Sequence, residues 1–407
     1  MNRILDTLQP YPFERLRALL DGVRPDPRHA PVSMSIGEPR HPAPPVVRDA
    51  LVAHLDGLSV YPPTRGSDAL REAMARWLCE RFGLARIDPA TQVLPVNGSK
   101  EALFSVAQAV VDPRGKDGER ACVVLPNPCY QVYEGAALLA GAEPAYVAQR
   151  PSNGFRPDWE TVPDEVWRRT QLVYVCSPGN PTGTVLRRSD WFRLFELSQR
   201  HGFVIASDEC YSEIYFDESA PPEGALAAAA AAGLDDWRGL LVFSSLSKRS
   251  SVPGLRSGLV AGDAALIERF LLLRTYNGGA MSATVQAASR AAWCDEAHVV
   301  ENRRLYREKF AAVTPVVAEA LQTAVPEGGF FLWARVPGGD DAAFARALYA
   351  QYNVLVLPGS YLGRSVQGIN PGSGFVRLAL VDDLASCLEA ARRIRTFTAE
   401  HRSDDRA

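Results

Sequence analysis

The sequence predicts an α/β protein, with a mixed, mainly parallel sheet in a large domain and a smaller α+β domain after it. The chain has 407 residues, enough for two or three domains. From residue 91 to residue 261, short runs that are apolar on both faces alternate with helical stretches, which is typical of parallel strands covered on both sides. Beyond Pro326, short strands and helices alternate and indicate the second domain.

The composition disfavours several classes of partner. Hydrophobic residues make up 47% of the chain, charged residues 22%, and the net charge is -3. No basic excess indicates nucleic-acid binding, and no stretch approaches the roughly 20 apolar residues of a membrane span. The seven cysteines include no Cys-x-x-Cys pair and the six histidines no His-Glu-x-x-His arrangement. We therefore expect no disulfide, no metal site and a cytoplasmic protein with reduced thiols.

The N-terminal part is expected to form an arm and two helices. Residues 1–45 are rich in proline and arginine and should lie across another surface. Helical spacing follows at 46–55 and again at 67–82, and a proline- and glycine-containing turn from Tyr61 separates the two helices. The second helix is amphipathic, so we expect it to pack on the core.

Apolar runs predict the strands of the large sheet, and polar stretches follow most of them. The runs are 92–96, 121–125, 172–176, 203–207, 240–244 and 258–261. Ligands in such sheets collect at the carboxyl ends of the strands, so the polar stretches should converge on one edge. These stretches are 97–100, 126–130, 177–183, 208–211 and the surroundings of Lys248.

The remaining elements set the predicted domain boundaries. An alanine run at 227–232 predicts a surface helix without chemistry, and long helices are expected at 264–276 and 282–313. The small domain should contain elements at 330–336, 341–352, 354–357, 375–380 and 382–400. We divide the chain into an arm that is part of the small domain (1–45), a large ligand-binding domain (46–285) and a small domain (286–407).

Lys248 is the strongest candidate for chemistry. The hydroxyls of Ser245 and Ser247 flank it, and Arg256 follows eight residues later. A lysine acts as a covalent catalyst when nearby positive charge or partial desolvation leaves its amine neutral. Hydroxyls and a guanidinium bind phosphate, and a carbonyl-reactive lysine beside a phosphate cradle is what pyridoxal 5′-phosphate (PLP) requires. Taken alone, the stretch also fits a solvated basic loop.

Three other stretches could bind the rest of such a cofactor. Asp208 follows an apolar strand, where its carboxylate could pair with a pyridinium nitrogen, and Tyr211 could donate to the ring's phenolic oxygen. The alternative is a solvated turn. Asn180 stands between two prolines in a rigid loop that can aim its amide at a ligand. The predicted helix start at Ser99 favours an anion, or is an ordinary N-terminal cap.

Nucleotide-binding motifs are missing from the sequence. Gly372-Ser373-Gly374 lacks the third glycine of a dinucleotide fingerprint, because Arg377 stands at that position. No Walker A sequence occurs either. The sequence therefore disfavours an enzyme that uses a dinucleotide or a nucleoside triphosphate.

From about residue 36 to residue 380 the chain resembles the class I/II aminotransferases, PLP-dependent enzymes of fold type I. The order and spacing of its motifs carry this resemblance. The motifs are Gly37-Glu38-Pro39, Tyr61 with Gly66 and Leu70-Arg71, Asn97-Gly98-Ser99-Lys100, Asn127-Pro128-Cys129-Tyr130, Asn180-Pro181-Thr182-Gly183, Asp208-Glu209 with Tyr211, Ser245 and Lys248 with Arg256, and Phe375-Val376-Arg377. The resemblance implies a homodimer with active sites at the interface, and amino acids and 2-oxo acids as substrates.

The resemblance also implies a role for each residue. Lys248 would carry PLP as a Schiff base, Asp208 would pair with its ring nitrogen, and Tyr211 would assist catalysis. The cofactor-binding set would be Ser99, Lys100, Tyr130, Asn180, Asp208, Tyr211, Ser245, Ser247, Lys248, Arg256 and the partner subunit's Tyr61. Arg377 would hold the substrate's α-carboxylate, beside Asn180 and the backbone at Gly37.

Within the family, the chain is most similar to the N-succinyldiaminopimelate aminotransferases of lysine biosynthesis. The stretches 245–258, 280–289 and 370–377 carry this similarity, and Ser251 departs from it because asparagine is expected there. The implied acceptor is 2-oxoglutarate. Such donors carry carboxylates beyond the one that Arg377 can bind, so a further cation should face the pocket. Arg40 and Arg364 are the candidates.

Other functions remain open. An aminotransferase of broad specificity and a C–S β-lyase would use the same fold and cofactor. A PLP-binding transcription regulator would need a DNA-binding domain ahead of the fold, and we expect no room for one. A plain α/β binding module would lack the yellow colour of PLP bound as a Schiff base, which borohydride can trap by reduction.

Overall fold

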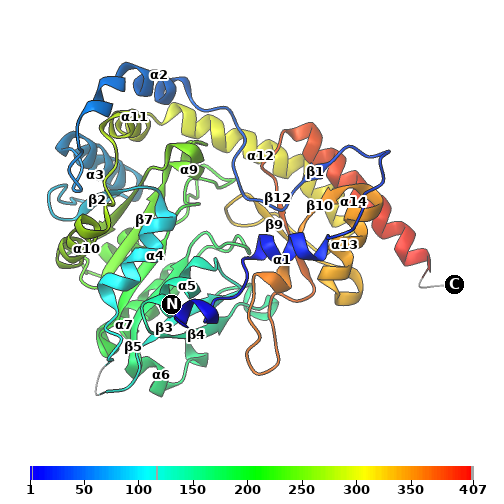
Figure 1. The fold of residues 1–407 in the computed structure, drawn as a ribbon, viewed down its shortest axis with the longest axis horizontal. Coiled ribbons are helices and arrows are strands. Elements are labelled where there is room, and N and C mark those ends of the chain that lie inside the picture. The colour runs from blue at the N-terminus through cyan, green and yellow to red at the C-terminus, as the bar shows by residue number, and fades with distance from the viewer. Residues whose placement is uncertain (2, 116–117, 405–407) are drawn as a thin grey trace.

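The structure, a computed structural model, describes residues 1, 3–115 and 118–404. Figure 1 shows two parts, with the helix α12 (Ala297–Ala318), drawn in yellow, running from one into the other. One part is built on a seven-stranded sheet, and the other holds a three-stranded and a two-stranded sheet. In the described part of the chain, no helix is long and apolar enough to span a membrane.

The large sheet has the predicted mixed, mainly parallel character. Its order is β2-β8-β7-β6-β5-β3-β4, and only β8 runs antiparallel to its neighbours. The strands are β2 (Val93–Val96), β3 (Cys122–Asn127), β4 (Glu143–Ala148), β5 (Thr170–Cys176), β6 (Val204–Asp208), β7 (Leu240–Ser245) and β8 (Gly258–Gly262). The predicted α/β fold class is confirmed.

The sequence does not predict β4. This strand lies at the edge of the sheet, contains Pro144, and among the described residues pairs only with β3. Most of its residues are exposed or half-buried, so it lacks the continuous apolar run that marks the central strands. An edge strand also tolerates a proline, since one side of its backbone has no ladder to complete.

Helices cover both faces of this sheet. They are α2 (Pro45–Ala53), α3 (Asp68–Phe82), α4 (Ser99–Val110), α5 (Val132–Leu139), α6 (Asp164–Arg169), α7 (Arg188–His201), α8 (Ala225–Ala231), α9 (Leu246–Arg249), α10 (Ala264–Asn277) and α11 (Ala283–Trp293). Neighbouring residues of β7 point to opposite faces, as strand geometry requires, so Val242 packs into one core cluster and Phe243 into the other.

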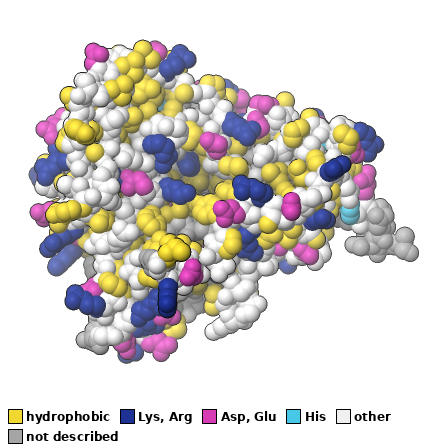
Figure 2. Space-filling model, viewed as in Figure 1, with side chains coloured by type: hydrophobic (Ala, Val, Ile, Leu, Met, Phe, Trp, Pro, Cys, Tyr) yellow, Lys and Arg dark blue, Asp and Glu magenta, His cyan; other side chains and the backbone are white. Residues whose placement is uncertain are grey.

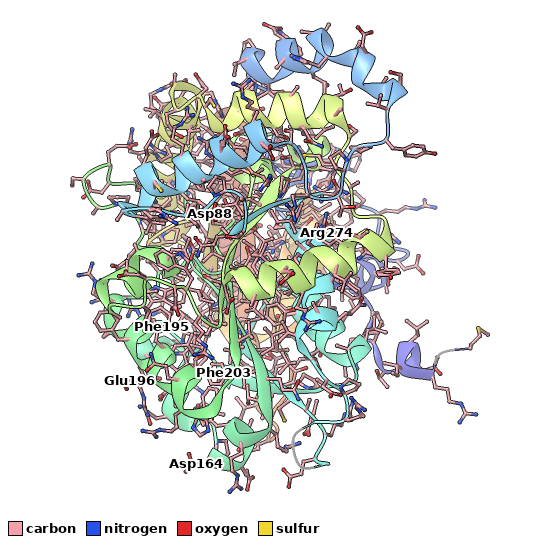
Figure 3. The ribbon with its side chains drawn as sticks, turned by 90° about the vertical axis from the view of Figure 1, so that its left-hand side faces the viewer. Asp88, Asp164, Phe195, Glu196, Phe203 and Arg274 are labelled. Atoms are coloured by element: carbon pink, nitrogen blue, oxygen red, sulfur yellow. The ribbon has the colours of Figure 1, made fainter. Side chains whose placement is uncertain are left out.

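An ion pair between a buried arginine and a half-buried glutamate supports the turn that follows β2. Arg274, labelled in Figure 3 near the end of α10, is fully buried and donates to Glu101 of α4 at 2.7 Å. Glu101 in turn accepts the backbone N–H of Asn97 at 2.9 Å. This chain of bonds therefore fixes the start of α4 against the end of β2.

The N-terminal arm completes the second part. Val32 of β1 (Val32–Ser33) pairs in parallel with Val354 of β10 (Val354–Leu355). The three-stranded sheet has the order β11-β12-β9. The remaining elements are α1 (Pro12–Leu19), β9 (Phe331–Arg335), α13 (Asp341–Tyr352), β11 (Leu357–Pro358), β12 (Phe375–Ala379) and α14 (Leu384–Asp404).

Two predictions from the sequence need correction. The expected helix at 282–313 is two helices, α11 and α12, because the chain turns at Asp295, whose carboxylate accepts the backbone N–H of His298 at 3.1 Å. The alanine run forms α8, but its Ala225, Ala228 and Ala229 are buried, so it is a core-packing helix rather than a surface one. The division at residues 45 and 285 stays a prediction, and α11 spans the second point.

Candidate active site

A cavity of about 180 Å³ lies where polar residues from both parts of the molecule meet. The large-sheet part contributes the residues after β2, β3, β5, β6 and β7, as the sheet-edge argument predicts. Gly37 comes from the arm and Arg377 from β12. The predicted site residues that line the cavity are Gly37, Ser99, Lys100, Tyr130, Asn180, Asp208, Tyr211, Ser247, Lys248, Arg256 and Arg377.

Lys248 lies on α9, a single short helix directly after β7. Ser245 caps this helix, since its hydroxyl oxygen accepts the backbone N–H of Ser247 at 3.1 Å. Ser245 also bonds the Ser247 hydroxyl at 3.0 Å, is buried, and does not line the cavity. The Lys248 amine makes no hydrogen bond within the described chain and lies 6.0 Å from the centre of the Tyr211 ring. Its nitrogen is therefore available to a ligand.

Asp208 ends β6 and is buried. One carboxylate oxygen accepts the hydroxyl of Tyr133 at 2.6 Å, and the other accepts the backbone N–H of Cys210 at 3.2 Å. The Tyr133 ring stacks on Tyr174 with centroids 4.8 Å apart. These neighbours hold the carboxylate at the cavity wall. Sequence reasoning missed Tyr133, although its place shortly after Tyr130 was a usable signal.

Two tyrosines keep their protons at the cavity. Burial raises the pKa of Tyr211 well above its usual range, and nearby Cys176 raises it further. Burial likewise raises the pKa of Tyr130. Both hydroxyls are therefore neutral donors at ordinary pH.

The turn between β2 and α4 forms a cationic corner with Arg256. Gly98 has φ 80°, and a Cβ there would collide with the guanidinium of Arg256. Arg256 itself adopts a left-handed conformation with φ 54° and donates to the carbonyls of Pro253 and Asn97 at 3.0 and 3.2 Å. Ser99 adds the first helical N–H group and a hydroxyl that accepts the thiol of Cys210 at 2.9 Å. Such a corner suits a phosphate.

Arg377 stands on the opposite wall, on β12, and is buried. It donates to the side-chain oxygen of Asn180 at 2.9 Å and to the carbonyl of Ser35 at 2.8 Å, and it lies 4.2 Å from the Phe331 ring centre. Burial lowers the pKa of Arg377 to about 10, which still leaves the guanidinium charged at neutral pH. Its Nε has no hydrogen-bond partner among the described residues, so an incoming carboxylate would add a bond there.

Besides Ser245, three predicted residues lie outside the cavity. Tyr61 is fully exposed, so this chain alone does not bring it to the site. Arg40 pairs with Asp382 at 2.5 Å, and Arg364 pairs with the buried Glu134 through bonds of 2.7 and 2.5 Å. Neither arginine lines the cavity. These ion pairs already compensate both charges, which disfavours the two arginines as ligands of a distal carboxylate within one chain.

Sequence reasoning also missed the residues that cover the cavity. Tyr11, Pro12 and Phe13 of the arm line it, and the Lys100 amine lies 5.1 Å from the Tyr11 ring centre. Nothing in the local sequence marks a short aromatic segment as part of a site that is far away along the chain. No cluster of His, Cys, Asp and Glu within the described residues has a geometry that could hold a metal ion.

Comparison with known proteins agrees with this geometry. The family model "Aminotransferase class I and II" matches residues 30–394. The chain belongs to the class I and II aminotransferases. This family depends on PLP, and its members act on amino acids and oxo acids. The fold is accordingly that of a fold-type I enzyme.

Individual relatives cover nearly the whole chain. A crystal structure of an aminotransferase from Neisseria meningitidis is 50% identical, with a TM-score of 0.94 over 98% of this chain and 100% of that one. An LL-diaminopimelate aminotransferase from Desulforudis audaxviator is 31% identical and covers 95% of each chain. The structure of a probable N-succinyldiaminopimelate aminotransferase from Thermus thermophilus is 26% identical, with a TM-score of 0.83 over 95% and 99% of the chains.

The residues around the cavity fit PLP. The Lys248 amine, which has no hydrogen bond to a described residue, matches the aldehyde of PLP, and the buried carboxylate of Asp208 matches its ring nitrogen. Neutral tyrosine donors match the phenolic oxygen, and the corner of arginine, hydroxyl and N–H groups matches the phosphate. Gly98 keeps the corner open, because any side chain there would displace Arg256. The individual roles of these residues remain predictions.

Proposed function

We propose that this aminotransferase transfers the amino group of a diaminopimelate-type donor to 2-oxoglutarate, with N-succinyl-LL-2,6-diaminopimelate as the first candidate donor. The observation that carries the proposal is the set of cations at the cavity: Lys100, Lys248, Arg256 and Arg377. Lys248 and Arg256 would bind the cofactor, and Arg377 would bind the substrate's α-carboxylate. Lys100, which the family resemblance places in the cofactor-binding set, is exposed at the mouth beside Tyr11, and we assign it instead to a carboxylate farther along the substrate.

PLP would be held by residues from several elements. Lys248 would bind it covalently through Nζ, Asp208 would bond the ring nitrogen, and Asn180 with Tyr211 would contact the phenolic oxygen. Ser99, Ser247 and Arg256 would hold the phosphate, with Ser245 fixing Ser247 from behind. When bound, PLP supplies a carbonyl carbon for the amino group and an electron-withdrawing ring that acidifies the substrate's Cα–H bond.

The chain's own residues would orient the donor and move its proton. Arg377 would bind the α-carboxylate with its free Nε–H and one terminal N–H, and Phe331 would support the guanidinium from its face. The substrate's amino group would first displace Lys248 from the cofactor, and the freed Lys248 Nζ would then take the proton from the substrate's Cα. Tyr130 would cover the site from the side of β3, and Tyr11 and Phe13 from the arm would exclude water.

LL-diaminopimelate itself is a second candidate donor. The curated relative from Desulforudis audaxviator carries that name, whereas the Thermus thermophilus structure carries the N-succinyl name. The two donors share the reacting amino acid and a distal carboxylate, and they differ in whether the far amine is free or acylated. Lys100 would repel a free ammonium and would attract a succinyl carboxylate, which favours the acylated donor.

The test is a panel of amino donors assayed with 2-oxoglutarate. We expect N-succinyl-LL-diaminopimelate to give the highest kcat/KM, with glutamate released, and alanine a much lower value. In Lys100→Ala the KM for the succinylated donor should rise about tenfold, since a charge-assisted hydrogen bond is lost, while the KM for alanine stays unchanged. Arg40→Ala is the matched control, because its ion pair with Asp382 lies outside the cavity.

The outcomes separate the candidates. A higher kcat/KM for LL-diaminopimelate than for N-succinyl-LL-diaminopimelate would show that the donor is not succinylated. Equal values for alanine and both diaminopimelates would favour a general aminotransferase. Release of pyruvate and ammonia from a cystathionine-type donor without glutamate formation would indicate a C–S β-lyase.

A further inference from the structure

The short helix α9 ends without the backbone partners that a longer helix would have. Its last carbonyl groups lack N–H donors one turn ahead, and such groups need other donors when they are buried. The side-chain amide of Asn302, from α12, donates to the carbonyls of Lys248 at 3.1 Å and Arg249 at 3.2 Å. Asn302 is buried. One amide therefore holds the backbone of the residue that we assign to the cofactor.

Two further side chains determine how this amide is oriented. The Asn302 oxygen lies 2.7 Å from Nδ1 of His41, and Nε2 of His41 lies 2.7 Å from the amine of Lys309. At one end two carbonyl oxygens can only accept, and at the other an ammonium can only donate. With Lys309 charged, His41 is therefore neutral and carries its proton on Nδ1, and the Asn302 NH₂ group faces α9. A single proton arrangement satisfies every contact.

This chain of contacts joins distant parts of the site. Lys309 is buried on α12 and also donates to the carbonyl of Val381 at 3.4 Å, just beyond the strand that carries Arg377. His41 lies four residues after Gly37, on the arm segment that borders the cavity. In Figure 1, α12 runs from the large-sheet part, where α9 lies, toward the part that contains β12. The contacts thus connect the substrate-carboxylate wall with the lysine.

We propose that Lys309, His41 and Asn302 form a hydrogen-bonded relay that positions the Lys248 turn relative to the Arg377 wall. The three are positioning residues and do not line the cavity. The inference rests on the role given to Lys248 in the proposed function. The first measurement, the protection of the turn against hydrogen exchange, does not depend on that role.

Two other contacts hold the same turn: Ser251 donates to the backbone carbonyl of His41 on the arm at 3.0 Å, and a group around His298 holds Ser250 without reaching the substrate side. Ser250 contacts Nε2 of His298 at 2.8 Å, and Nδ1 of His298 contacts Asp295 at 2.5 Å. This set resembles a catalytic triad, but Ser250 is buried and does not line the active-site cavity, so it acts as a support. The charged and titratable groups acting on the relay are Glu301 at His41, and Asp382, Asp383 and Cys387 at Lys309.

The test uses three variants on the full-length chain. Asn302→Asp keeps the acceptor for His41 but places a carboxylate without hydrogens against two carbonyl groups. Lys309→Met removes the far donor and leaves the Asn302 bonds to α9 in place. Thr314→Val is the matched control on the same helix, because its buried hydroxyl has no hydrogen-bond partner in the described structure.

Hydrogen exchange of the cofactor-free protein gives the first readout. The peptide covering residues 246–255 should exchange about tenfold faster in Asn302→Asp, less so in Lys309→Met, and at the wild-type rate in Thr314→Val. If this peptide exchanges at the wild-type rate in both Asn302→Asp and Lys309→Met, the proposed hold of Asn302 on α9 is contradicted. If Asn302→Asp fails to fold, Lys309→Met decides by the same criterion.

The PLP-loaded enzyme gives the second readout. We expect about tenfold lower kcat in Asn302→Asp with a nearly unchanged KM for the donor, since positioning acts on the transition state. The pH midpoint of the cofactor's visible absorption change should also shift. Faster exchange together with wild-type kcat and a wild-type midpoint would overturn the positioning role and leave only a structural contact. Inactive wild-type protein with normal exchange would instead contradict the proposed function.

Discussion

At the residue scale, adjacent carboxylates at the end of β6 have different surroundings. Asp208 lines the cavity, whereas Glu209 turns the other way and accepts the hydroxyl of Ser207 at 2.9 Å and the backbone N–H of Ala225 at 2.7 Å. Burial raises the pKa of Glu209 to about 7, against the bonds that lower it. Glu209 thus anchors the start of α8, and its ionisation above neutral pH lowers the stability of the fold.

Glu209→Gln should therefore stabilise the protein at high pH only. A carboxyl whose folded pKa lies above its unfolded value contributes stability below the unfolded pKa, and this contribution is lost as pH rises through the folded pKa. Glutamine can still accept both bonds and does not ionise. We expect the difference in unfolding free energy between variant and wild type to grow by about 2 to 3 kcal/mol from about pH 5 to about pH 8. Denaturant unfolding across this range is the measurement, and a difference independent of pH would contradict the assignment.

At the element scale, the turn between β2 and α4 shows how a helix start becomes a binding site. The first amides of α4 have no intrahelical partner because the helix has no carbonyl one turn before them, and the turn brings Arg256 over the same point. Glu101 and Arg274 hold the turn from behind. The corner depends on glycine at position 98, because the guanidinium occupies the space of a side chain.

Gly98→Ala should weaken PLP binding much more than it weakens the fold. The new methyl group would displace Arg256, and we expect the dissociation constant for PLP to rise about tenfold or more, as loss of a charge-assisted bond implies. Gly83→Ala is the matched control. That glycine also has a positive φ, 63°, but has open space around its position, so the variant carries the backbone strain without the collision.

Equilibrium dialysis of PLP against both glycine variants, together with their melting temperatures, tests this. Equal loss of PLP affinity in Gly98→Ala and Gly83→Ala would mean that strain, and not the displaced guanidinium, is responsible.

At the scale of the whole molecule, one face of the structure carries apolar side chains that a single chain leaves exposed. Figure 2 shows hydrophobic side chains gathered over α2, at the upper left. The exposed large hydrophobic residues on α2 and the segment after it are Val46, Val52, Leu55, Leu58, Val60 and Tyr61. A patch of this kind marks an interaction surface. It is consistent with the homodimer that the family resemblance implies, in which the partner subunit's Tyr61 would reach the phosphate corner.

Tyr61→Phe should leave the dimer intact and weaken PLP retention severalfold, because only one hydroxyl is removed. Tyr276→Phe is the control, since Tyr276 is also exposed but is not assigned to the cofactor. Light scattering would report the oligomeric state, and the rate of PLP loss on dilution would report the contact. A monomeric wild-type protein that retains PLP would contradict the shared site.

Local chemistry accounts for the parts that sequence reasoning predicted well. The central strands are apolar on both faces, so β2, β3 and β5 to β8 are recognisable, and the residues at their carboxyl ends meet because parallel strands share an edge. The edge strand β4 was not predicted, because an edge strand need not be apolar. The break between α11 and α12 escaped because the apolar spacing continues across it and only Asp295 marks the turn.

The sequence by itself determined the fold class, the family and most of the cavity-lining residues, because these depend on residue types at fixed spacings. Only the tertiary structure decided which charges are free. Arg40 and Arg364 are compensated by Asp382 and Glu134, far along the chain, whereas Lys100 remains at the cavity mouth. The relay from Lys309 to Lys248 is likewise invisible in the sequence, since a hydrogen bond between residues so far apart depends on the packing of α12 and not on any local pattern.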